Sequence, residues 1–471
     1  MRIFLLAALL LSFTTANSQL PTPVTLPNGW SLTPVGRTVP LGDLPLNMAV
    51  SHSGKRLAVS NNGQSGHSIQ YIDVATEQVL DLMVIDKAWY GLAFSDDDQL
   101  LYVSAGHDNR INVYATKGDH LKLIDSIPLG DPWPNKVGPA GIAINSKKNL
   151  LYAVTRDNRS LYIIQTSTKK ILQKIALGAE AYSCVLSPDR TILYVSLWGG
   201  DQVLKMNAND GNVISRVHVG DNPNEIIINK KGDQLYVANS NDNSVSVIRT
   251  SDMKVMETLN AALYADAVPG STSNGLALSA DEERLYIANA DNNALAVFEV
   301  EKMGSSRSLG FIPVGWYPTN VKVVGKKVLV TNGKGFNSMA NPNGPSPVEK
   351  KEKVIFQQGD AAKPAAVQYI GGLFKGTMSI FEEPTEQALG LYSRAVYSNT
   401  PYSKEKELLA AGEPGNPIPM KVGDPSPIKH VFYIVKENRT YDQVLADVPG
   451  GNGDTSLLLF GENITPNQHK L

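Results

Sequence analysis

The chain has 471 residues, with 43 Lys or Arg against 45 Asp or Glu and a formal net charge of −2. This balance excludes the basic surface that proteins use to bind nucleic acid or anionic membranes. Gly and Pro are frequent, at 39 and 28 residues, and apolar residues seldom recur at helical spacing. The composition therefore favours an all-β fold with many turns.

The N-terminal residues follow the order of an export signal. A positive residue precedes the apolar run Ile3–Phe13, and small residues follow at Ala16 and Ser18. The run is too short to cross a bilayer, which takes about 20 apolar residues. We predict a signal peptide over residues 1–18, cleavage before Gln19, and a soluble periplasmic or extracellular protein. A buried N-terminal strand is the alternative.

A phrase of similar sequence recurs seven times along the chain: an apolar strand, a polar turn, then Leu-Tyr-Val or a close variant. The first residues of the variants are 42 to 50 residues apart, and they are Leu57, Leu101, Leu151, Leu193, Leu235, Leu285 and Val328. Two further strands follow most of them. Four short antiparallel strands at this period describe one propeller blade, so we predict a seven-bladed β-propeller over residues 30–400. A linear β-solenoid is the alternative.

The phrases LYVAN, LYIAN and VLVTN resemble the YVTN-type β-propeller repeat of secreted and surface proteins. The seventh repeat is interrupted by a Pro-, Gly- and Lys-rich insertion, which we place at residues 333–375 and expect to lie on the surface. The early strand within residues 32–41 has the pattern of a fourth strand. We expect it to complete the last blade and close the ring.

Several aromatic residues fall in loops that open on one rim of the predicted ring. Trp89, Trp133 and Trp316 precede first strands, and Trp198 follows a second strand; Tyr317 lies beside Trp316. Aromatic residues exposed on one rim predict a recognition surface for a ligand or a protein partner. The alternative is that these rings fill gaps between blades.

The repeats contain no sequence pattern for a metal or haem site. The histidines are scattered over different predicted loops and strands, without an HxH or HExxH pair. Cys184 is the single cysteine, so the chain forms no intrachain disulfide, and its apolar neighbours predict a buried structural thiol.

The composition changes after the last repeat. A Pro-, Gly- and Lys-rich linker is predicted over residues 401–427, and the continuous apolar run Val431–Val435 then predicts a strand buried on both faces. Glu437 and Asn438 follow directly, and a helix is expected from Thr440. Ligands bind at the carboxyl ends of strands in open α/β sheets, where a carboxylate and an amide oxygen suit a divalent cation.

The stretch KHVFYIVKENRTYD, residues 429–442, resembles the opening of the phosphoesterase family. This family of the alkaline phosphatase superfamily includes phosphatidylcholine-type phospholipases C and acid phosphatases. The resemblance implies that Glu437 and Asn438 are ligands of a divalent metal; otherwise Asn438 or Thr440 is a plain helix cap. Residues 428–471 are too few for the nucleophile and the other ligands. We therefore expect an incomplete α/β segment, a truncated phosphoesterase domain that binds no metal tightly.

Two hypotheses from different classes follow. The first is a secreted, non-enzymatic propeller that binds a ligand or partner at its aromatic rim. The second is a metal-dependent phosphoesterase, active in a full-length relative. A propeller enzyme, such as a lactonase or a redox propeller, has no residue signature in the sequence.

Overall fold

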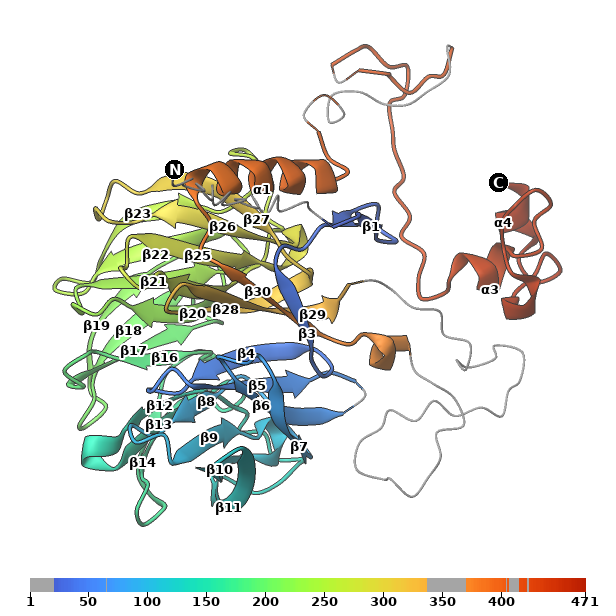
Figure 1. Cartoon of the computed structure of the whole chain (residues 1–471). Coiled ribbons are helices and arrows are strands. Elements are labelled where there is room, and N and C mark those ends of the chain that lie inside the picture. The colour runs from blue at the N-terminus through green and yellow to red at the C-terminus, as the bar shows by residue number, and fades with distance from the viewer. Residues whose placement is uncertain (1–20, 65, 337–369, 404, 406–414, 422) are drawn as a thin grey trace, which may run out of the picture.

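The structure is a computed structural model that describes residues 21–64, 66–336, 370–403, 405, 415–421 and 423–471. Seven antiparallel sheets of four strands are arranged in a ring, which confirms the seven-bladed β-propeller (Figure 1). The predicted signal peptide lies outside the described residues, as does most of the insertion predicted at 333–375. Among the described residues, no helix is both long and apolar enough to span a bilayer.

The first strands of neighbouring blades contact one another around the central axis. In blade order they are β4 (Pro45–Val50), β8 (Leu92–Phe94), β12 (Pro139–Asn145), β16 (Cys184–Leu186), β20 (Pro223–Ile228), β24 (Ser273–Leu278) and β28 (Trp316–Val324). The second strands are β5 (Arg56–Asn62), β9 (Leu100–Ser104), β13 (Leu150–Thr155), β17 (Ile192–Leu197), β21 (Gln234–Asn239), β25 (Arg284–Asn289) and β29 (Lys327–Gly335).

The third and fourth strands continue each blade outward. The third strands are β6 (His67–Asp73), β10 (Arg110–Lys117), β14 (Ser160–Gln165), β18 (Gln202–Asn207), β22 (Ser244–Arg249), β26 (Ala294–Glu299) and β30 (Thr377–Glu382). The fourth strands are β7 (Val79–Ile85), β11 (His120–Pro128), β15 (Lys170–Ala176), β19 (Val213–His218), β23 (Lys254–Asn260), β27 (Arg307–Pro313) and β3 (Arg37–Pro40). A separate two-stranded sheet joins β1 (Val24–Thr25) to β2 (Ser31–Leu32).

The recurring phrase of the sequence builds the packing between blades. All seven predicted anchor residues lie in second strands and are 0% exposed, because both faces of these strands are covered by neighbouring blades. Several second strands end in a buried Asn. The Asn239 side chain, for example, donates hydrogen bonds of 2.9 Å to the hydroxyls of Ser244 and Ser246 on the next strand. The repeated phrase thus specifies both the apolar core of a blade and the buried side-chain hydrogen bonds at the end of its second strand.

The ring closes as the sequence predicts, because β3 pairs with β30 and supplies the fourth strand of blade 7. Glu77, in the turn between β6 and β7 of blade 1, reinforces this closure. Its carboxylate accepts hydrogen bonds of 2.8 Å from Arg37 Nε of β3 and from Lys327 Nζ of β29. Blade 7 is therefore held both to the N-terminal strand and to blade 1.

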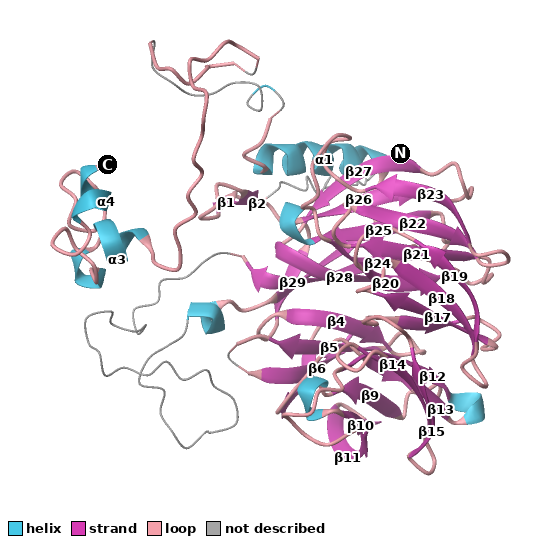
Figure 2. Cartoon of the chain, turned by 180° about the vertical axis from the view of Figure 1, so that it is seen from behind, coloured by secondary structure: helices cyan, strands magenta, loops and turns pink. Residues whose placement is uncertain are grey.

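One helix against the ring is not predicted by the sequence analysis. Helix α1 (Glu386–Asn399) begins after Thr385, whose hydroxyl caps the backbone N–H of Ala388. It packs on β27 of blade 6 (Figures 1 and 2), and its Ser393 hydroxyl accepts a 2.9 Å hydrogen bond from the Phe311 N–H. The helix thereby covers the outer edge of that blade, which would otherwise expose unpaired backbone groups.

The C-terminal segment stands apart from the ring in both views (Figures 1 and 2). The prediction of a buried strand at Val431–Val435 is wrong: these side chains are 71 to 89% exposed, and the backbone is extended without a strand partner among the described residues. An apolar run forms a strand only where another strand pairs with it. The predicted helix is present as α3 (Tyr441–Leu445), with Thr440 as its N-cap, and α4 (Pro466–Lys470) follows.

Candidate functional site

The loops before the first strands and those between the second and third strands meet at one end of the ring, which we call the entry face. A cavity of about 310 Å³ opens there on the central axis. Its lining comes from all seven blades: Leu44, Leu46, Trp89, Tyr90, Arg156, Ala181, Tyr182, Trp198, Asn224, Asn274, Tyr317, Thr319 and Asn320. We call this space the axial cavity. Because every blade contributes, its shape depends on the closed ring.

Two tyrosines from different blades form part of the wall of the axial cavity. The rings of Tyr90 (blade 2) and Tyr182 (blade 4) have their centroids 4.6 Å apart. Burial raises the pKa of both hydroxyls well above the usual range, and the nearby Glu225 carboxylate raises them further. Both phenols are therefore neutral at physiological pH and present apolar rings and hydroxyl groups, without charge.

A buried carboxylate is fixed beneath the axial cavity. Glu225, on β20, is 6% exposed and accepts hydrogen bonds from the backbone N–H of Leu276 at 2.7 Å and from Asn320 Nδ2 at 3.1 Å. Lys322 Nζ lies 2.6 Å from its other oxygen. Three donors from blades 6 and 7 thus hold a carboxylate of blade 5, which links these three blades.

A second cavity of about 490 Å³ lies beside the first, over blades 1 to 3. Its lining consists of Asn62, Gly63, Gln64, His67, Lys87, Ala88, Trp89, Gly106, His107, Gly138 and Arg156. We call it the outer cavity. It shares Trp89 and Arg156 with the axial cavity. These two residues therefore form the boundary between the two spaces.

The two boundary residues, Trp89 and Arg156, contact each other, and Arg156 is held by a further contact with Asp157. The guanidinium carbon of Arg156 lies 5.3 Å from the centre of the Trp89 ring, within the range of a cation–π contact. Arg156 Nε also lies 3.0 Å from Asp157 Oδ1, and His107 Nε2 lies 3.3 Å from Asp157 Oδ2. Asp157 thus orients both basic side chains of this edge.

The five predicted binding residues fall into three groups. Trp89, Trp198 and Tyr317 line the axial cavity. Trp133 is 60% exposed and packs on His107, with ring centroids 5.5 Å apart, at the outer cavity. Trp316 packs against Phe374 of the same blade, with ring centroids 5.5 Å apart. None of the five is fully buried. Their role in binding stays a prediction.

Sequence reasoning missed the polar residues of the site. Arg156 follows a second strand within a turn-like Arg-Asp-Asn sequence, where charged residues are common and indicate nothing specific. Glu225 carried a usable signal, because it is a lone carboxylate beside the apolar run Ile226–Ile228 of a strand that lines the axis. The predicted buried thiol is confirmed: Cys184 is 8% exposed, and burial raises its pKa to about 12.

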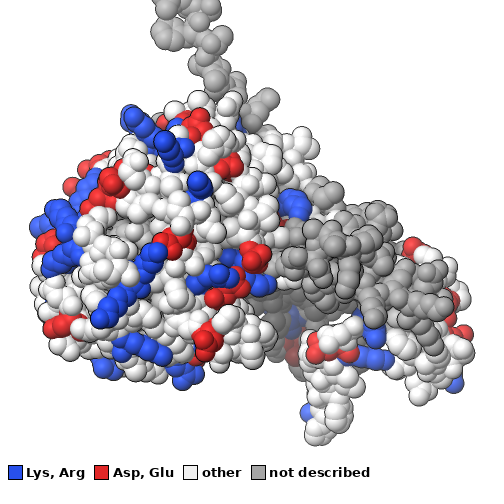
Figure 3. Space-filling model, turned by 90° about the horizontal axis from the view of Figure 1, so that it is seen from below, with Lys and Arg blue, Asp and Glu red and all other residues white. Residues whose placement is uncertain are grey.

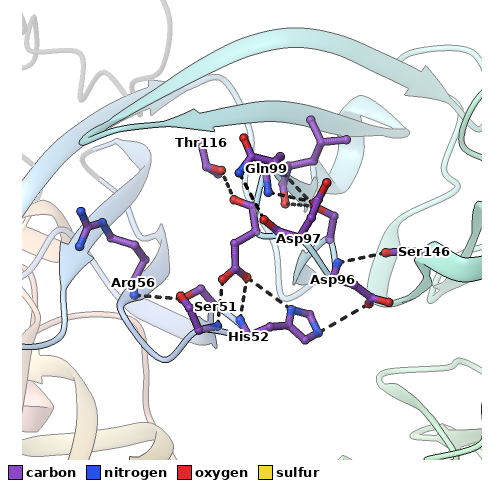
Figure 4. Close-up of polar contacts among 12 residues, drawn as sticks. Ser51, His52, Arg56, Asp96, Asp97, Gln99, Thr116 and Ser146 are labelled. Carbon is purple, nitrogen blue, oxygen red and sulfur yellow. Dashed lines mark hydrogen bonds and ion pairs between the residues drawn. The ribbon is translucent and has the colours of Figure 1, made fainter.

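The opposite end of the ring carries charged turns that tie blades together. His52 Nε2 lies 3.7 Å from Asp96 Oδ1, and His52 Nδ1 lies 3.4 Å from Asp98 Oδ1. Figure 4 shows the His52 ring directed at Asp96, with the Ser146 hydroxyl beside the Asp96 backbone N–H. Arg190, from blade 4, pairs with the Asp96 carboxylate of blade 2. These contacts join the turns of blades 1, 2, 3 and 4 at this end of the ring.

The surface outside the cavities has mixed charge. In the view of Figure 3, basic and acidic side chains are interspersed, without a large area of one sign. This distribution agrees with the near-zero net charge of the chain. It offers no extended basic patch of the kind that binds a nucleic-acid backbone on the face in view.

The predicted metal ligands Glu437 and Asn438 are exposed in the C-terminal segment. Glu437 lines a cavity of about 410 Å³ between α3 and α4, which Thr465 also lines, and Asn438 lies outside that lining. In the described part of the chain, no three His, Cys, Asp or Glu side chains are close enough together to hold a metal ion. Glu437 and Asn438 alone would leave most coordination positions of a divalent ion to water.

Comparisons with known proteins agree with the ring. The profile of the family described as "Lactonase, 7-bladed beta-propeller" matches residues 176–337, from the end of blade 3 into blade 7. The structure of hydrazine synthase from Kuenenia stuttgartiensis is similar over 62% of this chain and 93% of its own, with 19% identity and a TM-score of 0.54. At this identity the likeness concerns the fold alone.

A functionally unknown protein from Desulfotomaculum acetoxidans is also similar, over 58% of this chain and 86% of its own, with 17% identity and a TM-score of 0.48. No curated protein matches the sequence significantly. The residues of the axial and outer cavities therefore have to be interpreted from their own chemistry.

Proposed function

We propose that this protein binds a small organic ring compound in the axial cavity of the entry face. The observation that carries the proposal is the convergence of Trp89, Trp198 and Tyr317, from three different blades, on one cavity of about 310 Å³. Pockets for small molecules combine apolar and aromatic walls with a few fixed polar groups, and this cavity has that composition.

The polar groups of the cavity are held in place by contacts between blades. Asn224 Nδ2 donates a 2.9 Å hydrogen bond to Asn274 Oδ1, and Asn320 is fixed by its hydrogen bond to Glu225. Their positions are therefore set before a ligand arrives, which reduces the entropy lost on binding. Rigid amides below aromatic rings suit a flat ring that stacks on the walls and exchanges hydrogen bonds with the floor.

The test is isothermal titration calorimetry of the chain with neutral 2-naphthamide as probe. Trp198→Ala and Tyr317→Ala should each weaken binding about tenfold, since an aromatic contact of about 1.4 kcal/mol corresponds to that factor. Trp133→Ala, outside the axial cavity, is the matched control and should leave this affinity unchanged. Equal affinities of the wild type and the two cavity variants, or no binding at all, would contradict the proposal.

A second candidate function is hydrolysis of a lactone, because the family profile that matches residues 176–337 is described as a lactonase. Arg156, at the edge of the axial cavity, is the cation available to polarise a ring carbonyl there. Both carboxylate oxygens of Glu225 already accept hydrogen bonds from protein donors. A pH-stat assay with δ-gluconolactone tests this function: turnover by the wild type and its loss in Arg156→Gln would favour the enzyme over the binding protein.

For the C-terminal segment we propose a relation to phosphoesterases, supported by the Glu437-Asn438-Arg439-Thr440 sequence and its resemblance to that family. The chain should show negligible hydrolysis of 4-nitrophenyl phosphate with added zinc, manganese or calcium, since two exposed ligands hold a metal ion weakly. Metal-dependent turnover that Glu437→Ala abolishes would show instead that the segment is active.

We further propose that the repeats are of the YVTN type and that the protein is exported, on the sequence features of residues 1–18. Expression with this segment in a bacterial host should deliver a protein whose first residue is Gln19 to the periplasm. N-terminal sequencing of the fractionated protein checks this, and an uncut cytoplasmic product would argue against export.

A further inference from the structure

We propose that the outer cavity is an anion subsite for the ligand of the axial cavity, so that the ligand is a ring compound carrying a carboxylate or phosphate group. This inference rests on the proposed function and extends it from the ring to the charge of the ligand. It follows from the two residues that line both cavities, the basic side chains of the outer lining and the geometry of Arg156.

The two cavities are neighbours that share part of their lining. Trp89 and Arg156 line both of them, and the outer cavity leads from this pair toward His107. A ligand with its ring in the axial cavity would therefore direct a substituent past Arg156 into the outer cavity. A substituent of carboxylate or phosphate size occupies only a small part of a space of about 490 Å³.

The linings of both cavities lack carboxylates. The outer cavity contains Lys87 and Arg156 together with His67 and His107, and neither lining includes an Asp or a Glu. Asp157 stands behind this surface, where it pairs with Arg156 and His107. The lining of the outer cavity thus presents the basic side chains of Lys87 and Arg156, while the Asp157 carboxylate lies outside it.

Arg156 is positioned to meet an anion. Its Nε atom is engaged by Asp157 and its plane is held over Trp89, while its Nη1 and Nη2 atoms have no hydrogen-bond partner among the described residues. A guanidinium with two free parallel N–H groups binds a carboxylate or phosphate with two hydrogen bonds. The contacts with Asp157 and Trp89 hold it in place before the ligand arrives.

His67 supports the wall of the subsite without adding charge. Its Nδ1 atom accepts a 2.8 Å hydrogen bond from the N–H of Ala88, the residue before Trp89. Burial, with Lys87 nearby, lowers the pKa of His67 to about 4, so the ring is neutral at pH 7. His67 is therefore a positioning residue for the Lys87–Trp89 loop, and the attraction for an anion comes from Lys87 and Arg156.

The experiment compares three probes of one ring: 2-naphthoate, 2-naphthyl phosphate and neutral 2-naphthamide, titrated calorimetrically into the chain at pH 7.5. We expect at least one anion to bind about tenfold more tightly than the amide, the gain from a charge-assisted hydrogen bond. Naphthoate and naphthyl phosphate distinguish a carboxylate ligand from a phosphate ligand. Lys87→Gln, which lies only in the outer cavity, should reduce the preference for the anion while the amide affinity stays within about twofold. Arg156→Gln should also reduce this preference, measured as the ratio of the anion and amide affinities of the same variant, because Arg156 lines both cavities.

Matched variants keep the outcome interpretable. Arg216→Gln removes an exposed arginine from β19, away from both cavities, and should retain the full preference for the anion. Thermal melts of all variants show whether each is folded. If Arg156→Gln does not fold, Lys87→Gln provides the test of the anion subsite. Arg156→Lys keeps the charge and loses the paired donors, so it should retain part of the preference.

Equal wild-type affinities for the amide and both anions would overturn the subsite and leave the proposed function standing. A preference for the anion that survives in both Arg156→Gln and Lys87→Gln would also overturn it, since the anion would then bind elsewhere. If the anions bind but the amide does not, and Trp198→Ala and Tyr317→Ala leave the anion affinity unchanged, the anion subsite stands. The proposed ring site in the axial cavity would then be refuted. Failure of all three probes to bind would refute both proposals.

Discussion

Lys322 Nζ lies 2.6 Å from Glu225 Oε1, and this ion pair joins blade 7 to blade 5 across the central channel. The two side chains are 21% and 7% exposed, respectively. Because the Glu225 carboxylate also accepts from the Leu276 N–H of blade 6, one buried side chain links three successive blades. The three blades are thus joined by one polar network whose members depend on one another.

Glu225→Ala should lower the free energy of unfolding by about 3 kcal/mol, because it leaves Lys322 and two further donors without their acceptor in a buried place. The urea midpoint measures this loss. Lys231→Ala, which removes an exposed lysine that pairs within its own turn, is the control and should leave the midpoint unchanged. An equally small change in both variants would show that the channel pair does not contribute to stability.

Ring closure should depend on acid pH through Glu77. The hydrogen bond from Arg37, with Lys327 beside it, lowers the pKa of Glu77 from 4.5 to about 2. A carboxyl with a lowered folded-state pKa stabilises the fold above its unfolded pKa, and this contribution is lost as the pH falls from about 4.5 through about 2. Glu77→Gln should therefore unfold at a lower urea concentration at pH 7 and lose less stability on acidification than the wild type.

The control for Glu77 is Asp252→Asn, since the Asp252–Arg249 pair lies within one exposed turn. This variant should keep the wild-type midpoint at pH 7. If Glu77→Gln and the wild type show the same pH profile between pH 5 and 2.5, the proposed link between Glu77 and ring closure is wrong.

The buried Asn at the end of a second strand should be costly to replace. Asn239→Ala removes two hydrogen bonds of 2.9 Å and leaves the hydroxyls of Ser244 and Ser246 without their donor. We expect a loss of about 1–3 kcal/mol in the free energy of unfolding. Asn241→Ala, two residues on and exposed, should cost far less. Similar losses in both variants would indicate that the buried hydrogen bonds contribute nothing specific.

The thiol of Cys184 should be inert in the folded protein. Its burial and its pKa of about 12 leave almost no thiolate at pH 8, and the thiolate is the reactive form. Reaction with 5,5′-dithiobis(2-nitrobenzoate), followed by absorbance, should be at least about 100-fold slower than in the same protein unfolded in urea. Rapid labelling under native conditions would show that blade 4 opens readily.

The fold could be predicted because each blade repeats the same local requirement. A second strand covered on both faces needs a continuous apolar core, so residues such as Leu193 and Leu235 recur in register and mark the blades. The role of the early strand was also visible, since the pattern later found in β3 matches other fourth strands. Helix α1 was not predicted, because an all-β interpretation of the sequence does not include a helix after the last blade.

The site could be predicted only in part. Aromatic residues in loops are conspicuous in a sequence, and Trp89, Trp198 and Tyr317 do meet at one cavity. The roles of Arg156, Glu225 and Lys322 depend on partners that are distant in the sequence. These partners come into contact only when the ring forms. The run Val431–Val435 shows the reverse: its composition is that of a strand, but pairing depends on a neighbour that the local sequence does not specify.

The pairing of β3 with β30 sets the order in which the propeller is completed. Thr38 lies opposite Ser379, so one of the earliest strands of the domain to leave the ribosome has to wait for one of the last. Six blades consist of strands that are consecutive in the sequence, while the seventh combines β28, β29 and β30 with β3 from the start of the domain. Such a distant contact makes closure the slow step of folding. Until it forms, the outer edge of β30 in blade 7 has no strand partner and remains open to pairing with other chains.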